Sequence, residues 1–492
     1  MSSAGLDQSR LEELLDRRSR RLRALVLMLA MGSSVGVAIY GLINLVALHP
    51  YGLADDFRVF FAAAKVVAGG GNPYRPGALT AVEQAVQHYP HHGLQPILDS
   101  FAYLPVAATL LGPLTILGFW PSYTLFTVIG LLALLVVTAF LARDLGWRRI
   151  GTLEFGVAVC WIVVLGFTSG QFDALMFAVL GGAMLLAWHD RPLPAGLVLG
   201  LVWIQPDLLW PAPIFLFLAL ANRHAQASRF AVGFAATSVL CLGVHANLLP
   251  AWWVALRHFA ASLARGQPDL AGLPGLLGAA PKAWGLGTGI LAPGTFAVIA
   301  VALVCMGVFS VWMMTSSDWM RVSAVGRVAW GVGLPVAIWL AATPDAHPHD
   351  DVLLLPLFML TVGRDARRVH GRGLGLALVV VVWFLLIWPS ELIPWPLGLL
   401  ALAGLSVVLW RRRTDVALTG FGAGLCLLAL AILPVVWPLH LLRVGLTPVA
   451  VLLLVVEGAR TCWMEVGGAG TGPAYVVDPQ SGSEAASAPA GG

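Results

Sequence analysis

Long apolar runs dominate this chain and limit the folds it can adopt. Stretches of about 20 mainly apolar residues, the length that crosses the hydrocarbon core of a bilayer as a helix, recur from Ala24 to Glu457 between short charged or Pro- and Gly-rich breaks. Only 11% of the 492 residues are charged, whereas soluble domains carry roughly 25%. The pattern excludes a water-soluble fold and predicts an all-α, polytopic integral membrane protein with roughly 12–14 membrane helices.

The basic residues predict how the chain is oriented. An arginine-rich stretch precedes the first apolar run, and cytoplasmic segments of membrane proteins are enriched in Lys and Arg, so residues 1–22 are expected in the cytoplasm. Residues 24–48 are longer than the apolar part of a signal peptide and lack a small-residue cleavage site, so we expect the first membrane helix there. The predicted location is the cell (inner) membrane, with the outer loops facing away from the cytoplasm.

The predicted cytoplasmic N-terminus allows the rest of the chain to be divided into a membrane domain and a tail. Residues 23–464 are expected to form the membrane domain, and residues 49–121 its first outer loop, with interfacial helices. A full span at residues 101–120 would carry the next basic turn to the outer side, so that run is expected to be interfacial or re-entrant. Residues 465–492 are rich in Gly, Ala, Ser and Pro, which predicts a disordered cytoplasmic tail.

A second apolar run is expected to enter the membrane and return on the same side. Residues 193–221 have basic flanks at both ends and reverse at Gln205-Pro206-Asp207. A broken helix at membrane depth is tolerated only where it lines protein or a water-filled cavity. Gln205 and Asp207 are therefore candidates for the end of a cavity below the outer surface.

Composition also excludes several classes of ligand. The net charge is only +4 and lacks the basic patch of a nucleic-acid-binding protein. The five cysteines show no disulfide or metal spacing, and the Gly-Gly-Gly at residues 69–71 follows no strand, so it is interpreted as a helix stop rather than a nucleotide loop. We therefore expect no nucleic acid, cofactor or metal.

Two acids at the start of the first outer loop are the leading catalytic candidates. Asp55 and Asp56 follow the first predicted helix, and the apolar spacing of the next residues predicts a short helix on the membrane surface. A carboxylate held there could act as a general base on a hydroxyl of a lipid-anchored substrate. The alternative is that Asp56 only caps the short helix, which the residues by themselves favour.

Two further polar groups stand near predicted helix ends. The cluster His347-Pro348-His349-Asp350-Asp351 lies at an outer helix start, where backbone N–H groups favour anions such as phosphate. Its spacing matches no strong metal signature, and helix capping by Asp350 is the alternative. Gln171 and Asp173 form the other group, in which Asp173 could cap its helix; Asp207, beside two prolines, is the stronger functional candidate.

Several segments, in this order, resemble one family of membrane enzymes. They are DFRVFFAAAKVVAGGGNPY from Asp56 to Tyr74, FAYLPVAATLLGPL, GQFDALMFAVL and AGLVLGLVWIQPDLLWPAPIFL. Their order and spacing, over residues 23 to about 363, resemble GT-C fold, polyprenyl-phosphate-mannose-dependent mannosyltransferases. That family is related to the mycobacterial phosphatidylinositol-mannoside enzyme and to glycosyltransferase family 87.

The resemblance implies an activity and a set of site residues. It implies transfer of a sugar, mannose in that family, from a polyprenyl-phosphate donor to a lipid or glycan acceptor, with membrane lipids as surroundings. Asp56 would be the catalytic base, and His347, His349 and Asp350 would lie near the donor phosphate or the acceptor. Gln205 stands where the family commonly has Lys. The missing positive charge is therefore expected from Arg257, Arg265 or Lys282 in the second predicted outer loop, from Ala251 to about Leu286. The other predicted substrate-binding residues are Asp55, Arg58, Tyr74, Gln171, Asp207, Arg257, Arg265 and Lys282.

A carrier is the main alternative function. A transporter or lipid flippase could build its site at the broken helix around Gln205 and Asp207, but it would predict matching interruptions in the two halves of the chain. No such symmetry is present, and the residue-rich first outer loop favours an enzyme. A non-catalytic lipid-binding protein of the same fold is the third interpretation.

Overall fold

The computed structural model is helical throughout the part of the chain that it describes. It describes residues 53–86, 101–263, 273, 274, 291–365 and 439–468, apart from 76, 146, 148–150, 152, 153, 155, 156, 159 and 345. No strand occurs within these ranges. Outside these ranges lie the predicted first helix, His88, His91 and His92 of the predicted first outer loop, Arg265, Lys282 and residues 366–438. The prediction of an all-α membrane protein is confirmed.

Four described helices are long and apolar enough to span a bilayer. They are α5 (Phe119–Asp144), α12 (His224–Gly243), the Gly294–Thr315 part of α15 (Leu291–Thr315), and α17 (Ala324–Ala342). Most of α17 is buried in the bundle, whereas α15 is largely exposed through side chains such as Val304 and Val308. Exposed apolar helix faces of this kind suit contact with lipid tails.

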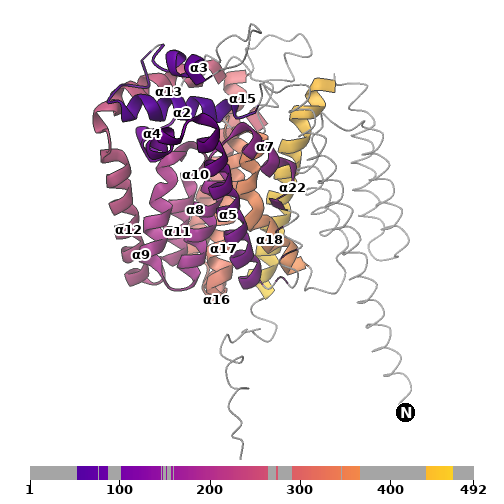
Figure 1. Ribbon diagram of the computed structural model, residues 1–492. Helices are drawn as coiled ribbons and strands as arrows, with labels where there is room; N and C mark the ends of the chain where they lie inside the picture. The colour runs from indigo at the N-terminus through magenta and orange to yellow at the C-terminus, as the bar shows by residue number, and fades with distance from the viewer. Residues whose placement is uncertain are drawn as a thin grey trace, which may run out of the picture.

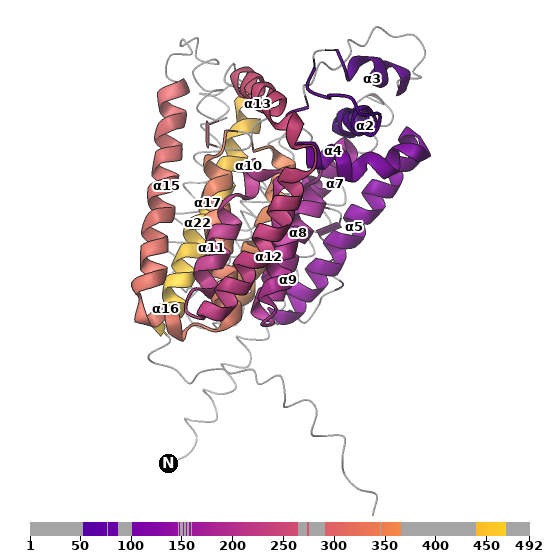
Figure 2. The same ribbon diagram turned by 90° about the vertical axis from the view of Figure 1, so that its left-hand side faces the viewer.

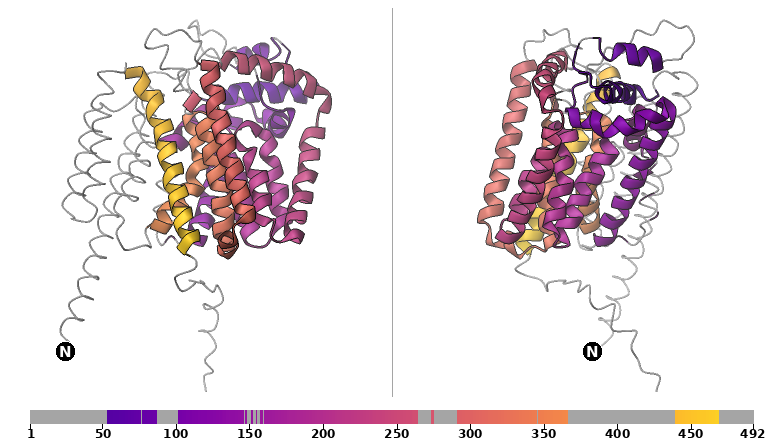
Figure 3. Two further views of the ribbon diagram at one scale, coloured as in Figure 1. Left: turned by 180° about the vertical axis from the view of Figure 1, so that it is seen from behind. Right: turned by 60° about the vertical axis from the view of Figure 1, so that its left-hand side comes forward.

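Shorter helices complete the bundle. Beside the four spans lie α7 (Trp161–Ser169), α8 (Asp173–Trp188), α9 (Pro192–Leu199), η4 (Gly200–Ile204), α10 (Pro206–Leu209), α11 (Pro211–Leu220), η7 (Pro348–Leu354), α18 (Leu355–Asp365) and α22 (Leu439–Gly468). Figure 3 shows α15 and α22 on the side of the bundle opposite to the view of Figure 1. α22 continues past the predicted boundary at 465, where Glu465 Oε2 accepts a hydrogen bond from Trp330 Nε1 (3.0 Å).

A second group of helices lies across one end of the bundle. These are α2 (Asp55–Ala68), α3 (Thr80–Val86), α4 (Pro105–Leu111) with η3 (Gly112–Leu117), and α13 (Leu249–Leu263), which follows η5 (Ala246–Leu248). Figures 1 and 2 show them above the upright helices, at what we call the upper face; α16 (Ser317–Arg321) lies at the opposite, lower face. Trp252 Nε1 of α13 donates to the carbonyl oxygen of Ala102 (2.8 Å), which joins α13 to the segment before α4.

The helix α2 is buried more deeply than its sequence predicts. It was expected to lie on the membrane surface, but Phe57, Phe60 and Phe61 are at most 2% exposed. The helix packs against α3, α4 and η3, and Phe57 contacts the ring of Phe119 on α5. Apolar side chains pack equally well against protein and lipid, so their spacing alone could not distinguish the two surroundings.

The run around residues 193–221 turns back within the bundle, as its flanking charges predict. α9 rises from the lower face, α10 lies toward the upper face and α11 descends again (Figures 1 and 2). α9 packs backbone to backbone on α12: a Cβ on Gly196 would lie 2.1 Å from the carbonyl oxygen of Phe230. Such small-residue contacts are typical of membrane helix pairs.

Candidate functional site

The acids of α2 begin the candidate site at the upper face. Asp55 and Asp56 are the first two residues of α2, while the N-cap is Ala54, which has a φ of 60° and no side-chain cap. The N–H of Ala54 donates to the carbonyl oxygen of Thr168 at the end of α7 (2.6 Å). Asp56 is therefore not the N-cap residue of α2; it is half-buried and follows directly after the backbone contact between α2 and α7.

A glycine allows α2 to approach α7 this closely. Gly170 has a φ of +79°, a conformation that glycine adopts without strain. A Cβ at Gly170 would lie 2.4 Å from Cβ of Phe57, the residue after Asp56. The position of the acids thus depends on the missing side chain at Gly170.

Arg58 is engaged within α2. Its guanidinium Nη2 lies 2.5 Å from Asp55 Oδ1, and Arg58 is 6% exposed. Arg58, predicted to bind substrate, pairs with the neighbouring acid in this structure. Among the predicted cations, Arg257 on α13 is described and exposed.

Tyr103, which sequence reasoning did not select, lies at the centre of the acidic groups. Its hydroxyl donates to Gln171 Oε1 (3.2 Å), and Tyr74 donates its own hydroxyl to the carbonyl oxygen of Tyr103 (2.7 Å). Burial raises the pKa of Tyr103 well above its usual value. The carboxylates of Asp207, Asp56, Asp350 and Asp173, in that order, raise it further. Acids from α2, α8, α10 and η7 therefore converge around this one phenol.

The break between η4 and α10 supplies the third part of the site. Gln205 is 4% exposed, and its Oε1 has no hydrogen-bond donor among the described residues. The next residues are fixed by α17, because Trp339 Nε1 donates to the carbonyl oxygen of Asp207 (2.6 Å) and packs edge-on against Trp210. The side chain of Asp207 remains half-buried. The structure thus brings Asp207 toward the acids of the first outer loop, as its charge effect on Tyr103 indicates.

The histidine cluster forms the start of η7. His347 and Asp350 make a reciprocal capping box, in which Asp350 Oδ2 accepts from the N–H of His347 (2.7 Å) and the His347 ring accepts from the N–H of Asp350. Capping by Asp350 is therefore present, but Asp350 is 1% exposed rather than solvated. Burial, then the charge of Asp173, raises its pKa well above the usual value. Burial, then His347, lowers the pKa of His349.

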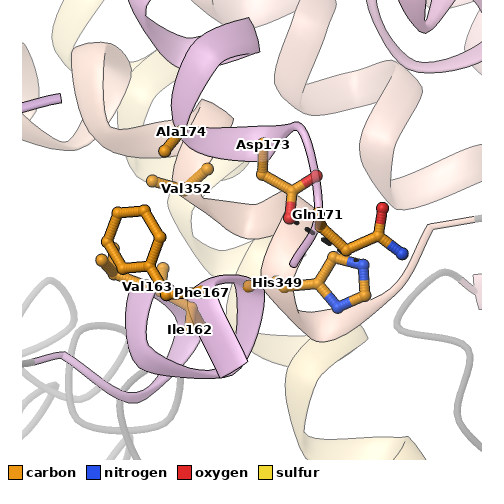
Figure 4. Close-up of a pocket in the computed structure, with 9 residues that line it drawn as sticks. Ile162, Val163, Phe167, Gln171, Asp173, Ala174, His349 and Val352 are labelled. Carbon is orange, nitrogen blue, oxygen red and sulfur yellow. Dashed lines mark ion pairs between the residues drawn. The ribbon is translucent and has the colours of Figure 1, made fainter. Parts of the chain in front are cut away.

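A small pocket lies between α7, α8 and η7, with room for about one water-sized group. Figure 4 shows Asp173 and His349 directed toward each other beside Gln171, with His349 Nε2 3.9 Å from Asp173 Oδ2. The cap of α8 is Phe172 without a side-chain hydrogen bond, so the capping interpretation of Asp173 is wrong. The sequence signal that could have selected Asp173 is an ionisable side chain between two predicted apolar helices.

The same cluster has a geometry that a metal could use. His347, His349 and Asp350 each offer a ligand atom, and these atoms lie within 4.8 Å of one another. However, one ring nitrogen of His347 accepts the N–H of Asp350, so a neutral ring carries its proton on the other nitrogen. His347 would have to leave the capping box, or lose that proton, to bind a metal.

Asp351 gives a pH-dependent prediction for stability. Burial raises its pKa well above the usual value, so the folded protein binds this proton more tightly than the unfolded chain does. Its contribution to stability is complete below the unfolded pKa of about 3.9 and is lost as the pH rises through the folded pKa. We expect Asp351→Asn to raise the melting temperature in detergent at pH 8 more than at pH 5. An equal effect at both pH values would contradict this.

Comparisons with known proteins identify a family for half of the chain. The family model described as glycosyltransferase family 87 matches residues 101–346 of 492. No curated protein and no solved structure matches the chain. The matched range contains Tyr103, Asp173, Gln205 and Asp207, and lies between α2 and η7.

Proposed function

Because the chain belongs to glycosyltransferase family 87, we propose that it transfers a sugar, mannose, from a polyprenyl-phosphate donor to a lipid or glycan acceptor, with Asp56 as general base. The family establishes a glycosyltransferase; the donor, sugar and acceptor are the proposal. The observation that carries the proposal is the convergence of Asp56 and Asp207 with the buried acids around Tyr103 at one end of a membrane bundle.

The proposed reaction is a single inverting displacement. Asp56 takes the proton of the acceptor hydroxyl while that oxygen forms a bond to the anomeric carbon. The bond between the anomeric carbon and the phosphate oxygen breaks, and its electron pair leaves with polyprenyl phosphate. Cationic or N–H donors would stabilise that developing charge. Arg257 on α13, exposed at the same face, is the described candidate for this role.

The distribution of charge supports an extracytoplasmic site in the cell (inner) membrane. The lower face carries Arg143, Arg191, Arg223, Arg229, Arg321 and Arg327 at helix ends. Cytoplasmic ends of membrane helices are enriched in such residues, so the upper face would be the outer one. Sugar nucleotides do not cross a bilayer unaided, and an outer site would therefore need a lipid-borne sugar.

The carrier alternative has less support. Trp339 fixes the break at Asp207 through a backbone hydrogen bond and the ring of Trp210. The break also belongs to the residues that match a glycosyltransferase family. We therefore assign Gln205 and Asp207 to the same substrate site as Asp56.

Oriented membrane vesicles test this proposal. Right-side-out vesicles containing the chain, given a membrane-impermeant, short-chain isoprenyl-phosphate mannose with a radiolabelled sugar, are expected to form a labelled lipid or glycan product. Sealed inside-out vesicles should form little, and vesicles without the chain none. Matching glucose and galactose donors test the sugar. Transfer from GDP-mannose alone in washed membranes, or transfer only in inside-out vesicles, would contradict the proposed donor or orientation.

A further inference from the structure

Asp173 has a buried carboxylate whose hydrogen-bonding capacity is only partly filled. It is 2% exposed, and among the described residues only the protonated carboxyl group of neighbouring Asp350 is a donor to its oxygens. His349 Nε2, at 3.9 Å, is beyond hydrogen-bonding distance. A buried carboxylate oxygen without a donor is destabilising. Asp173 can therefore accept a further hydrogen bond from a group that enters the pocket.

Asp350 supplies one hydrogen bond to this carboxylate. Its Oδ2 accepts from the N–H of His347, and its Oδ1 has no donor in the described part of the chain. Burial and the charge of Asp173 raise the pKa of Asp350, so Oδ1 holds a proton and donates to Asp173. The other oxygen of Asp173 can still accept a hydrogen bond from a ligand.

The space in front of Asp173 is kept open by the backbone. A Cβ on Gly166 of α7 would lie 3.0 Å from Asp173 Oδ2 and 3.5 Å from Cβ of His349. Gly166, Gln171, Asp173 and His349 all line the small pocket (Figure 4). The pocket has room for about one water-sized group, such as a single hydroxyl, and not for a whole sugar ring.

The chemistry of the pocket favours a ligand that donates hydrogen bonds. A phosphate offers only further negative charge to the Asp173 carboxylate, so electrostatic repulsion opposes its binding. A sugar presents O–H donors, and one of them can donate to the open oxygen of Asp173. Gln171 can both donate and accept beside them. The charges of Asp56 and Asp207 act on Asp173, which indicates that the pocket adjoins the proposed base.

We propose that Asp173, held by its hydrogen bond with Asp350, accepts a hydrogen bond from one hydroxyl group of the transferred sugar and so selects which sugar is transferred. The inference rests on the proposed function and deepens it. It assigns Asp173 to the sugar of the donor, with Asp350 as its positioning residue, while the phosphate binds elsewhere at the upper face.

Deoxygenated donors test this subsite. The short-chain isoprenyl-phosphate mannose and its 2-, 3-, 4- and 6-deoxy analogues are compared by kcat/KM in the wild type, Asp173→Ala and Asp173→Asn. In the wild type, at least one analogue should lose about 10- to 100-fold, as expected for a lost hydrogen bond to a charged group. In Asp173→Ala the same analogue should lose less than about 3-fold relative to the parent donor, because its partner is gone.

Control variants and alternative outcomes separate the inference from the function. Asp173→Asn keeps the side-chain volume and one acceptor, so the same deoxy analogue should show an intermediate loss of kcat/KM in it. This variant carries the test if Asp173→Ala does not fold. Asp351→Asn, a buried neighbour that does not line the pocket, should keep the wild-type pattern.

Three results would overturn the inference. Equal deoxy penalties in wild type and in both Asp173 variants would remove the sugar subsite but leave the transfer activity standing. Loss of wild-type activity in EDTA, with recovery in Zn²⁺ or Mn²⁺, would instead identify a cation site. No transfer from the parent donor by the wild type would overturn the proposed function and this inference together.

Discussion

Asp56→Asn is expected to lower kcat for sugar transfer by about 10²- to 10⁴-fold, the usual contribution of a general base. Asparagine has nearly the same size and is compatible with the first turn of a helix, so α2 should keep its place beside α7. The variant lacks the basic carboxylate that would take the acceptor proton. The KM for the donor should change little, because the lost interaction acts on the acceptor.

Initial rates with the short-chain donor, in detergent-purified protein of matched melting temperature, measure this effect. Asp318→Asn at the lower face is the matched control, since Asp318 is exposed and pairs with nearby Arg321. Asp207→Asn is the informative comparison, because Asp207 is the other half-buried acid near Tyr103. Full activity of Asp56→Asn together with an inactive Asp207→Asn would move the base to Asp207.

The fold could be predicted well because membrane helices need a simple pattern. In lipid every backbone polar group must be satisfied within the protein, so long apolar runs have few alternatives to helix. The return of the chain near Gln205 followed from arginines at both flanks. The burial of α2 did not follow, because Phe57 and Phe60 have an apolar spacing that suits a lipid surface as well as a protein core.

The site was predicted only in part, for a different reason. Asp56, Asp207 and the histidine cluster stand beside breaks in apolar runs, where polar residues attract attention. Tyr103 and Asp173 acquire their importance from contacts across the fold, such as the hydrogen bond from Tyr103 to Gln171. Capping is a common reason for Asp at a helix start, and only the geometry at Phe172 excludes it for Asp173.

Arg58 illustrates the same limit for charge. Its position three residues after Asp55 is compatible with an ion pair along the helix or with a phosphate contact, and the sequence does not decide between them. In the structure the guanidinium is buried against Asp55. The structure therefore favours the ion pair along the helix over a phosphate contact for Arg58.

Gly170→Ala should be the most damaging small substitution outside the acids themselves. The new Cβ would lie 2.4 Å from Cβ of Phe57, whereas carbon atoms pack at about 3.5–4.0 Å, so the start of α2 must retreat by roughly 1 Å. Asp56 precedes Phe57 and would move with it. A displacement of this size can reduce catalysis by about 10²-fold.

Gly118→Ala separates this effect from backbone strain. Gly118 also has a positive φ, +82°, but a Cβ there would meet no atom within 4 Å. Both alanine variants bear a backbone cost, about 1–2 kcal/mol for the left-handed conformation of Gly170 and about 1–3 kcal/mol for Gly118, whose ψ of 171° belongs to a region that glycine alone adopts readily. Gly118→Ala should therefore lower the melting temperature at least as much from that cause. Only Gly170→Ala should also lose transfer activity at a temperature where both are folded. Equal activity in the two variants would show that Asp56 does not depend on the contact between α2 and Gly170.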